Sequence, residues 1–458
     1  MILAFLALVA LSVSIAFLDW RKGFLLTILC GVLQDPVRKL TPGTPVVLSM
    51  TVVVVYAAVL FAALPAIRAG FRDFSARFWR LKSPAVVIAF LLLLSAMNGV
   101  VTFGIANWQA PLLSLFLYLV PVPAVLLGYV HLRQESDLLG LLRFYAVVTT
   151  AALTGTVLEY FRVDFPALGV VALSGDYIRH LPGIQIRVLS GFYRGPDIMG
   201  WHAAMLAITG IILSLRERTF TRALPWIGVA GWGFVNCMIS GRRKAIYMVA
   251  VFVVVLVWRY AKRLRTAQIL SLVLVGVVMV GIVREIASNE RSSVYARGAA
   301  ATRQELLQRI EGGTLETIRQ YGFFGAGLGT ATQGVYHVAR GRDLGWQEGG
   351  LAKLTVELGV PGVIAVLAFG FALLRLLLAI TRHPDLPETS QYIRAALFAI
   401  IAANAGNFAA SAQAYSDPLL TLLTAFLLGT LLATATLDER AAAAEQPAAR
   451  TGLSAATA

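Results

Sequence analysis

The chain has 458 residues, of which 58% are hydrophobic and only 14% are charged. Soluble domains carry about 25% charged residues, so this composition, with a mean hydropathy of +0.76, excludes an ordinary soluble protein. The formal net charge of +15 would suggest nucleic-acid binding in a soluble chain. Here most basic residues fall in short segments between apolar runs, which argues against nucleic acid as a partner.

Apolar runs of about 18–23 residues recur along the chain, and runs of this length are typical of transmembrane helices. We predict an all-α, polytopic integral membrane protein with about 12–13 spans. The candidate spans are 1–19, 23–34, 45–66, 83–104, 111–131, 138–160, 197–215, 223–240, 245–260, 268–284, 351–378, 392–412 and 417–436. Segment 23–34 is short and stops at Gln34-Asp35-Pro36, so it is either a full span or a half-span. Cys30 and Cys237 both lie in apolar segments and predict neither a disulfide nor a metal site.

Short basic loops set the orientation. The basic loops at 67–82, 216–222 and 259–265 fall on the same side of the membrane when successive spans alternate in direction. The positive-inside rule places that side in the cytoplasm. The opposite loops, 105–110, 161–196, 241–244, 285–350 and 413–416, then face outward. The predicted organisation is an N-terminal bundle at 1–160, an outer loop at 161–196, core spans at 197–284, a large outer loop at 285–350, C-terminal spans at 351–437 and a disordered cytoplasmic tail at 438–458.

One outer loop breaks this rule. Ser240-Gly241-Arg242-Arg243-Lys244 puts three cations between two spans on the side where cations are unexpected. Three explanations remain open at this point: snorkelling side chains, a wrongly phased span, or an anion-binding site at the membrane surface.

The large outer loop contains two recognisable patterns. Thr302–Tyr321 has apolar residues at helical spacing, interrupted by Gly312-Gly313, which predicts two short amphipathic helices. The glycine-rich run Tyr321–Thr330 follows. Such glycines can cradle a phosphate, but no strand precedes them and no lysine follows, so a nucleotide-binding motif is disfavoured. We predict a tight irregular turn with positive φ angles instead, close to the functional site.

Four segments in order carry a family resemblance: Gly191-Phe192-Tyr193-Arg194-Gly195-Pro196-Asp197, Ser240-Gly241-Arg242-Arg243, the glycine-rich run, and Leu351–Gly362 with Glu357-Leu358-Gly359-Val360-Pro361-Gly362. Together they resemble the O-antigen ligase and O-antigen polymerase family of bacterial envelope proteins. The resemblance covers about residues 190–365. There is one departure: the family's ligases carry a histidine nine residues before this glutamate, where this chain has Glu348, and His337 lies eleven residues earlier still.

The resemblance implies a multi-pass protein of the bacterial inner membrane with its active site facing the periplasm. It implies transfer of a glycan from an undecaprenyl-diphosphate-linked oligosaccharide to a hydroxyl of an acceptor glycan or lipid, with no cofactor and no metal. Membrane lipids and other envelope polysaccharide assembly proteins are the implied partners. The resemblance does not decide between a polymerase and a ligase. Glu348 in place of the histidine favours an exopolysaccharide polymerase.

The residues themselves suit that chemistry. A diphosphate leaving group needs concentrated positive charge, and the guanidinium fork binds phosphate oxygens with two hydrogen bonds. We therefore expect Arg194 and Arg242 to act in catalysis, with Arg243 and Lys244 binding substrate. Glu348 is the candidate base for the attacking hydroxyl, or else a carboxylate that only stabilises a helix N-terminus.

The other candidates each have a structural alternative. Arg303 and Arg319 either bind the sugar or lipid phosphate or face solvent. Tyr193 and Trp346 either stack on sugar rings or anchor at the interface. Asp417 either binds the acceptor or caps a helix, and the cap is favoured.

The remaining ionisable residues are weaker candidates. His180 and His337 either act in acid–base chemistry or are solvated in loops. His202, inside a span, is either functional or a neutral hydrogen-bonded residue. Glu357 is favoured as a packing or ion-pairing residue. Two other functions remain open: a lipid-linked glycan transporter or flippase, or a non-catalytic component of an envelope assembly system.

Overall fold

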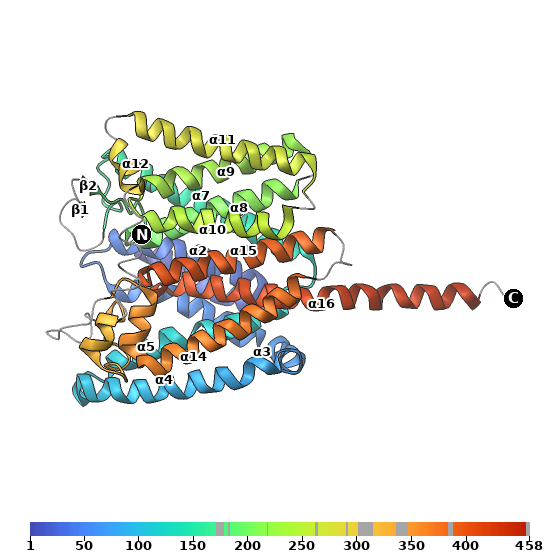
Figure 1. Ribbon diagram of the computed structural model, residues 1–458, viewed down its shortest axis with the longest axis horizontal. Helices are drawn as coiled ribbons and strands as arrows, with labels where there is room; N and C mark the ends of the chain where they lie inside the picture. Colours follow the sequence, from blue (N-terminus) through green and yellow to red (C-terminus); the bar gives the residue numbers. More distant parts are fainter. Residues whose placement is uncertain are drawn as a thin grey trace.

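The computed structural model describes residues 1–170, 178–181, 184–217, 219–261, 264–289, 292–300, 315–335, 347–382 and 388–454. These residues form a bundle whose helices run broadly along one direction (Figure 1). The α-helices are α1 (Ile2–Leu18), α2 (Trp20–Lys39), α3 (Thr51–Arg77), α4 (Lys82–Phe103), α5 (Gln109–Leu119), α6 (Pro121–His131), α7 (Glu135–Tyr160), α8 (Pro196–Arg216), α9 (Phe220–Ile239), α10 (Arg243–Tyr260), α11 (Thr266–Ser288), α12 (Ser293–Ala300), α14 (Gly350–Thr381), α15 (Glu388–Ala410) and α16 (Pro418–Ser454). Short 3-10 helices are η1 (Val46–Met50), η2 (Trp79–Leu81), η3 (Ile105–Asn107) and η6 (Gln413–Ser416).

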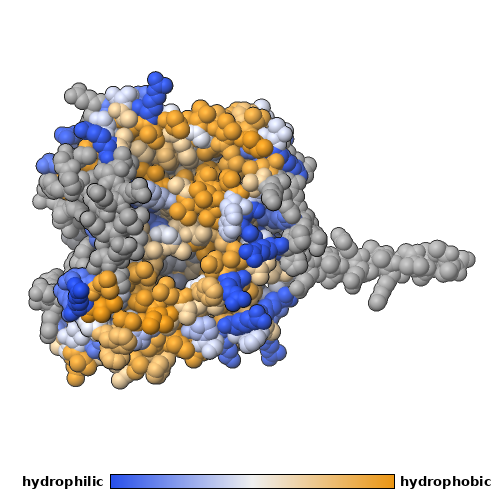
Figure 2. Space-filling view, in the orientation of Figure 1, coloured by the Kyte–Doolittle hydropathy of each residue, from blue (hydrophilic) through white to orange (hydrophobic). Residues whose placement is uncertain are grey.

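The helices fit a polytopic membrane protein. The predicted spans fall on helical segments, with 45–66 on η1 and α3 and 111–131 on α5 and α6. Among the described residues, nine helical segments are long and apolar enough to cross a membrane: Val46–Arg77, Trp79–Phe103, Gln109–His131, Glu135–Tyr160, Pro196–Arg216, Gln268–Ser288, Gly350–Thr381, Ser390–Ala410 and Pro418–Thr436. Hydrophobic side chains cover the middle of the visible face, and hydrophilic ones gather toward both ends of the bundle (Figure 2).

The core of the bundle is α8, whose apolar window is 94% buried. The helix starts with Pro196, a residue suited to a first helical position because its missing N–H would have no helical partner there. It packs against α7, α9 and α10. Glycines let α8 and α9 approach closely, since a Cβ on Gly210 would lie 2.5 Å from the Ala230 nitrogen. Small residues at such contacts are the usual means of packing helices in a membrane.

Helix α2 corrects one prediction. The segment does not stop at Gln34-Asp35-Pro36 but continues as a helix to Lys39. Polar residues at this end of α2 are buried rather than solvated, and Asp35 is only 2% exposed. A hydropathy pattern ends a span where such residues begin, whereas here they are retained in the helix because distant parts of the chain provide them with partners.

Two further segments differ from the expectation. The all-α prediction missed a two-stranded hairpin in the 161–196 loop, in which β1 (Ile178–Leu181) pairs antiparallel with β2 (Ile184–Arg187). Apolar and polar residues alternate in these strands, and Ile186 is buried in a small cluster with Met238 and Ile286. The predicted disordered tail at 438–458 is helical up to Ser454, as the end of α16.

The glycine-rich run forms the predicted turn and supports a break in α14. Gly322, Gly325, Gly327 and Gly329 all have positive φ. Gly359 interrupts α14 with a φ of 67°. The turn supplies partners for the backbone groups at this break: Val360 N donates to Phe323 O at 2.8 Å, and Ala326 N donates to Val356 O at 2.7 Å. Broken helices at membrane depth need such replacement partners.

Substitution at the tight contact between α6 and α16 should destabilise the protein. A Cβ on Gly128 would lie 2.0 Å from Phe426 O. Gly128→Val should therefore lower the free energy of unfolding by about 1–3 kcal/mol or more, as overpacking does, and lower the thermal midpoint in detergent. Gly140→Val is the matched control, because a Cβ at this helical glycine meets nothing within 4 Å. Equal midpoints for the two variants would contradict the packing.

Candidate functional site

One short stretch, residues 411–417 between α15 and α16, connects most of the segments predicted to face outward; we call it the connecting segment. Lys244 Nζ donates to Ser411 Oγ at 2.6 Å. Ala412 N donates to the Glu348 carbonyl at 2.8 Å. Its last residue, Asp417, pairs with Arg194 at 2.5 Å. The loops that carry Arg194, Lys244 and Glu348 therefore meet at the same end of the bundle.

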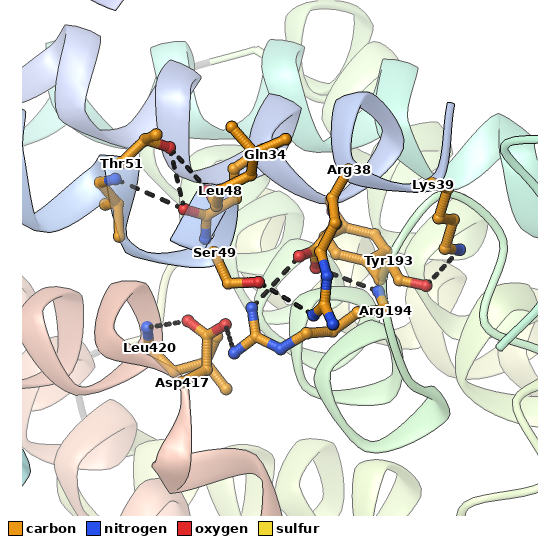
Figure 3. A network of polar contacts seen from close by, with 12 residues as sticks. Gln34, Arg38, Lys39, Leu48, Ser49, Thr51, Tyr193, Arg194, Asp417 and Leu420 are labelled. Carbon is orange, nitrogen blue, oxygen red and sulfur yellow. Dashed lines mark hydrogen bonds and ion pairs between the residues drawn. The ribbon is translucent and has the colours of Figure 1, made fainter. Parts of the chain in front are cut away.

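Arg194 is held between two carboxylates from distant helices. Its Nη1 donates to Asp35 Oδ1 at 3.2 Å and its backbone N–H donates to Asp35 Oδ2 at 3.0 Å. Its Nη2 pairs with Asp417 Oδ2 at 2.5 Å, as Figure 3 shows. The arginine side chain is 17% exposed, and the two aspartates are 2% and 3% exposed. Burial alone would lower the pKa of Arg194, but Asp417 and Asp35 outweigh it and raise that pKa.

Asp417 performs two tasks. Its Oδ1 accepts the Leu420 N–H at 3.2 Å, so it caps the start of α16. Its other oxygen binds Arg194. Burial and the nearby Asp35 raise the pKa of Asp417, while Arg194 and the capping N–H groups oppose that rise. The predicted cap is confirmed, and the ion pair comes in addition to it.

A second pair of charges, the half-buried Lys39 and the buried Glu159, fixes the backbone just before Arg194. Lys39 Nζ donates to the carbonyls of Gly191 at 2.7 Å and Tyr193 at 2.6 Å. Glu159 Oε2 accepts the N–H groups of Ser190 at 2.9 Å and Gly191 at 2.6 Å. Burial lowers the pKa of Lys39 to about 8. The turn that presents Arg194 is thus held from both sides.

Asp197 holds two of the three cations that break the positive-inside rule. It lies in the first turn of α8, pairs with Arg242 Nη2 at 3.1 Å and forms an ion pair with Lys244. With its amide nitrogen turned toward Asp197, Gln413 donates to both carboxylate oxygens at 3.0 and 3.1 Å. Burial lowers the pKa of Lys244, against the opposing effects of Asp197 and Glu348. These cations are paired within the protein rather than snorkelling.

Glu348 lies beside this cluster. It is half-buried and stands immediately before Gly349, the N-cap of α14. Its charge acts on Lys244. Because it precedes the cap, Glu348 is outside the first turn of the helix. Arg243, the first residue of α10, is buried at 7% exposure.

Two predicted residues lie in the interior. Tyr193 is 2% exposed and its ring stacks on His202, with centroids 4.7 Å apart; this burial does not fit the predicted stacking on a sugar. His202 Nδ1 shares a hydrogen bond with the Tyr145 hydroxyl at 2.9 Å, as expected of a neutral, hydrogen-bonded histidine.

The loop candidates divide into two groups. Arg319 is 81% exposed and pairs with Glu316 at 3.8 Å, a residue three positions away, which fits the solvent-facing alternative. Arg303, His337 and Trp346 lie outside the described residues. His180 is placed only through its backbone in β1.

Glu357 joins the glycine-rich turn to the bundle. It is fully buried, and its carboxylate accepts from Tyr118 at 2.7 Å, Thr332 at 2.6 Å, Gly329 N at 3.2 Å and Ser114 at 3.4 Å. A buried carboxylate tolerates its environment when several donors surround it. The favoured packing role therefore takes the form of hydrogen bonds that fix the turn between α5 and α14.

The residues predicted from the sequence did not include Asp35, Lys39, Glu159, Asp197 or Gln413. A signal existed for Asp35, because an acidic residue at the end of an apolar run is expensive in a membrane and needs a partner. No pattern in the sequence marked Asp197 or Glu159, because an aspartate at a helix N-terminus and a glutamate at a helix C-terminus are both common. Among the described residues, no three His, Cys, Asp or Glu side chains gather as a metal site would require.

No protein-family model matches the sequence, and no curated protein matches it.

Removing the Arg194 side-chain charge should destabilise the fold. Arg194→Met leaves Asp35 and Asp417 buried without their cation, a change that costs about 3–5 kcal/mol for a buried ion pair. Thermal unfolding in detergent should show a clearly lower midpoint. The control is Arg143→Met, which removes an exposed arginine paired at 3.9 Å and should cost less than about 1 kcal/mol. Similar midpoints for both variants would refute the buried pair.

Lys39 should give the protein a specific pH dependence. Its folded pKa of about 8 lies below the unfolded value of about 10.4, so the unfolded state binds more protons between these values. Stability should rise as the pH increases through this window. From about pH 7.5 to 9.5, the wild type should gain roughly 2 kcal/mol relative to Lys39→Met, measured by denaturant unfolding. A constant difference between the two proteins would show that Lys39 has an ordinary pKa.

Proposed function

We propose that this protein is a membrane glycosyltransferase that transfers or polymerises a glycan from a polyprenyl-diphosphate-linked donor onto a sugar hydroxyl. One observation supports it most: the four segments that resemble the O-antigen ligase and polymerase family are joined in space. Asp197 pairs with Arg242. The Glu348 carbonyl accepts the N–H of Ala412 in the connecting segment. Glu357 accepts hydrogen bonds from the glycine-rich turn. The four stretches thus meet in two pairs, 191–197 with 240–243 and the glycine-rich run with 351–362. The connecting segment reaches the first pair through Asp417 and, through Ala412, the residue Glu348 just before the second.

The oriented hydrogen-bond donors at this end suit a diphosphate. A guanidinium has five N–H donors, and the two aspartates engage Nη1 and Nη2 of Arg194. Carboxylates that orient an arginine make it a preorganised donor, which strengthens its interaction with charge developing on a leaving oxygen. In our proposal Arg194, Arg242 and Lys244 stabilise the departing diphosphate.

Glu348 would complete the reaction. As the sugar–phosphate C–O bond breaks, its electrons leave with the diphosphate, and the acceptor oxygen forms the new C–O bond. The acceptor hydroxyl must lose a proton, and Glu348, half-buried and near Lys244, is the carboxylate we assign to take it. We place the site on the periplasmic side of a bacterial inner membrane, following the charge of the opposite loops.

A second function has one observation in its favour. The break in α14 at Gly359 is the kind of helix interruption that transporters use at their binding sites. A lipid-linked glycan transporter would move labelled carrier across a vesicle membrane without forming a glycosidic bond. Measuring both products in the same vesicles separates the two functions.

The test of the enzyme proposal is polymer or conjugate formation from a lipid-linked donor in membranes containing each variant. We expect Arg242→Ala with Arg243→Ala to lower the rate about 10²-fold or more, and Glu348→Gln to lower it about 10²–10⁴-fold. Arg143→Ala, an exposed arginine outside these contacts, is the control and should keep the wild-type rate. Wild-type yield from the correctly inserted double variant would remove the assigned role.

A further inference from the structure

Four exposed cations, besides Arg77, gather at the corner where α3 turns into α4. They are Arg68, Arg72, Arg80 and Lys82. The corner also contains Asp73, the one acidic residue between positions 67 and 82. Asp73 is engaged locally, because it accepts from Arg77 Nε at 2.7 Å and from the Tyr129 hydroxyl at 2.5 Å.

The corner is a built structure rather than a loose loop. Phe78 is 6% exposed and packs edge-on against Phe74 and Tyr129, with ring centroids 5.0 and 6.0 Å apart. Phe74 and Tyr129 also meet at 5.2 Å. This aromatic trio fixes the corner on α6, so the four cations are presented on a rigid support and lose little conformational freedom when they bind a ligand.

Two aromatic side chains accompany the cations at the surface. Trp79 is 64% exposed and Phe71 is 52% exposed. The Arg80 guanidinium carbon lies 5.7 Å from the centroid of the Trp79 ring. Tryptophan and arginine side by side are typical of the level at which lipid chains meet headgroups, where the ring is amphipathic and the cation reaches phosphate.

The corner lies at the opposite end of the bundle from the connecting segment. In Figure 1, α3 and α4 meet at the lower right, whereas β1, β2 and α12 lie at the left. In the same orientation, hydrophilic side chains gather over this lower right end, next to a broad apolar surface (Figure 2). Both helices that leave the corner are apolar enough to span a membrane, so the cations stand at the height of the headgroups.

We propose that the α3–α4 corner is a binding site for the phosphate headgroup of an anionic phospholipid of the surrounding bilayer. Four exposed cations outnumber the single carboxylate of Asp73, which already pairs with Arg77, and so attract a diester phosphate, while Trp79 and Phe71 contact the upper part of its acyl chains. Juxtamembrane cations attract anionic lipid headgroups at the membrane surface. The site is independent of the proposed glycan transfer, which takes place at the other end of the molecule.

Native mass spectrometry of the full-length protein in neutral detergent tests this site. Phosphatidylglycerol and phosphatidylcholine are titrated separately, and the bound lipid is counted. We expect phosphatidylglycerol to bind at concentrations about tenfold lower than phosphatidylcholine. The variant Arg68→Ala, Arg72→Ala, Arg80→Ala, Lys82→Ala should lose this preference.

The charge-matched control removes four other exposed cations: Arg143→Ala, Arg222→Ala, Arg375→Ala and Arg382→Ala. It should keep the preference. If both variants lose it equally, the attraction is diffuse and the proposal fails. Displacement of the bound phosphatidylglycerol by inorganic phosphate would also overturn it, because the corner would then be a site for free anions. Should the fourfold variant not fold, Arg68→Ala with Arg72→Ala, both exposed on α3, makes the same comparison and should lower the preference at least threefold.

Discussion

The ion pairs of Arg194 with the buried Asp35 and Asp417 are the constraint on which the end of the bundle around the connecting segment depends. A lone guanidinium in a nearly dry environment is too costly to keep, so the cation requires both carboxylates and each carboxylate requires the cation. The three residues come from α2, the loop before α8 and the start of α16. Satisfying one charge therefore fixes the relative position of three parts of the chain that are far apart in sequence.

The same principle organises the neighbouring cluster. Asp197 neutralises cations from the start of α10, and Gln413 adds two hydrogen bonds to the same carboxylate. Because Gln413 and Asp417 are both in the connecting segment, the two clusters share one support. Polar networks in a low-dielectric environment are stable only when every member has a partner. This requirement gives a rigid arrangement of arginines and lysines at one end of an otherwise apolar bundle.

The sequence was sufficient to predict what depends on local chemistry. Apolar runs gave the helices, because a backbone in lipid must satisfy its own hydrogen bonds, and the glycine-rich run gave a turn with positive φ. The end of α2 was misjudged for a physical reason: hydropathy treats Asp35 as a residue that must reach water, while in the fold it meets Arg194, 159 positions away. The partners of Arg242 and Lys244 were missed in the same way. Pairing between distant helices is a property of the packed state, and no local pattern encodes it.

Cations are exposed at one end of the bundle and paired with carboxylates at the other. This difference explains the exception to the positive-inside rule. The rule counts lysines and arginines without asking what they contact. At the α3–α4 corner the cations are exposed, and their charge acts on whatever lies outside the protein. At 242–244 the charge of Arg242 and Lys244 is opposed by Asp197 at close range, with Glu348 nearby. The local net charge there is far smaller than a count of basic residues implies, so the loop can face outward with the remaining outer segments. In the sequence, the cluster at 242–244 looks like an error in the predicted topology. In the structure, Arg242 and Lys244 are retained because a carboxylate from another helix pairs with them. This is the arrangement expected of a charged site inside a membrane protein.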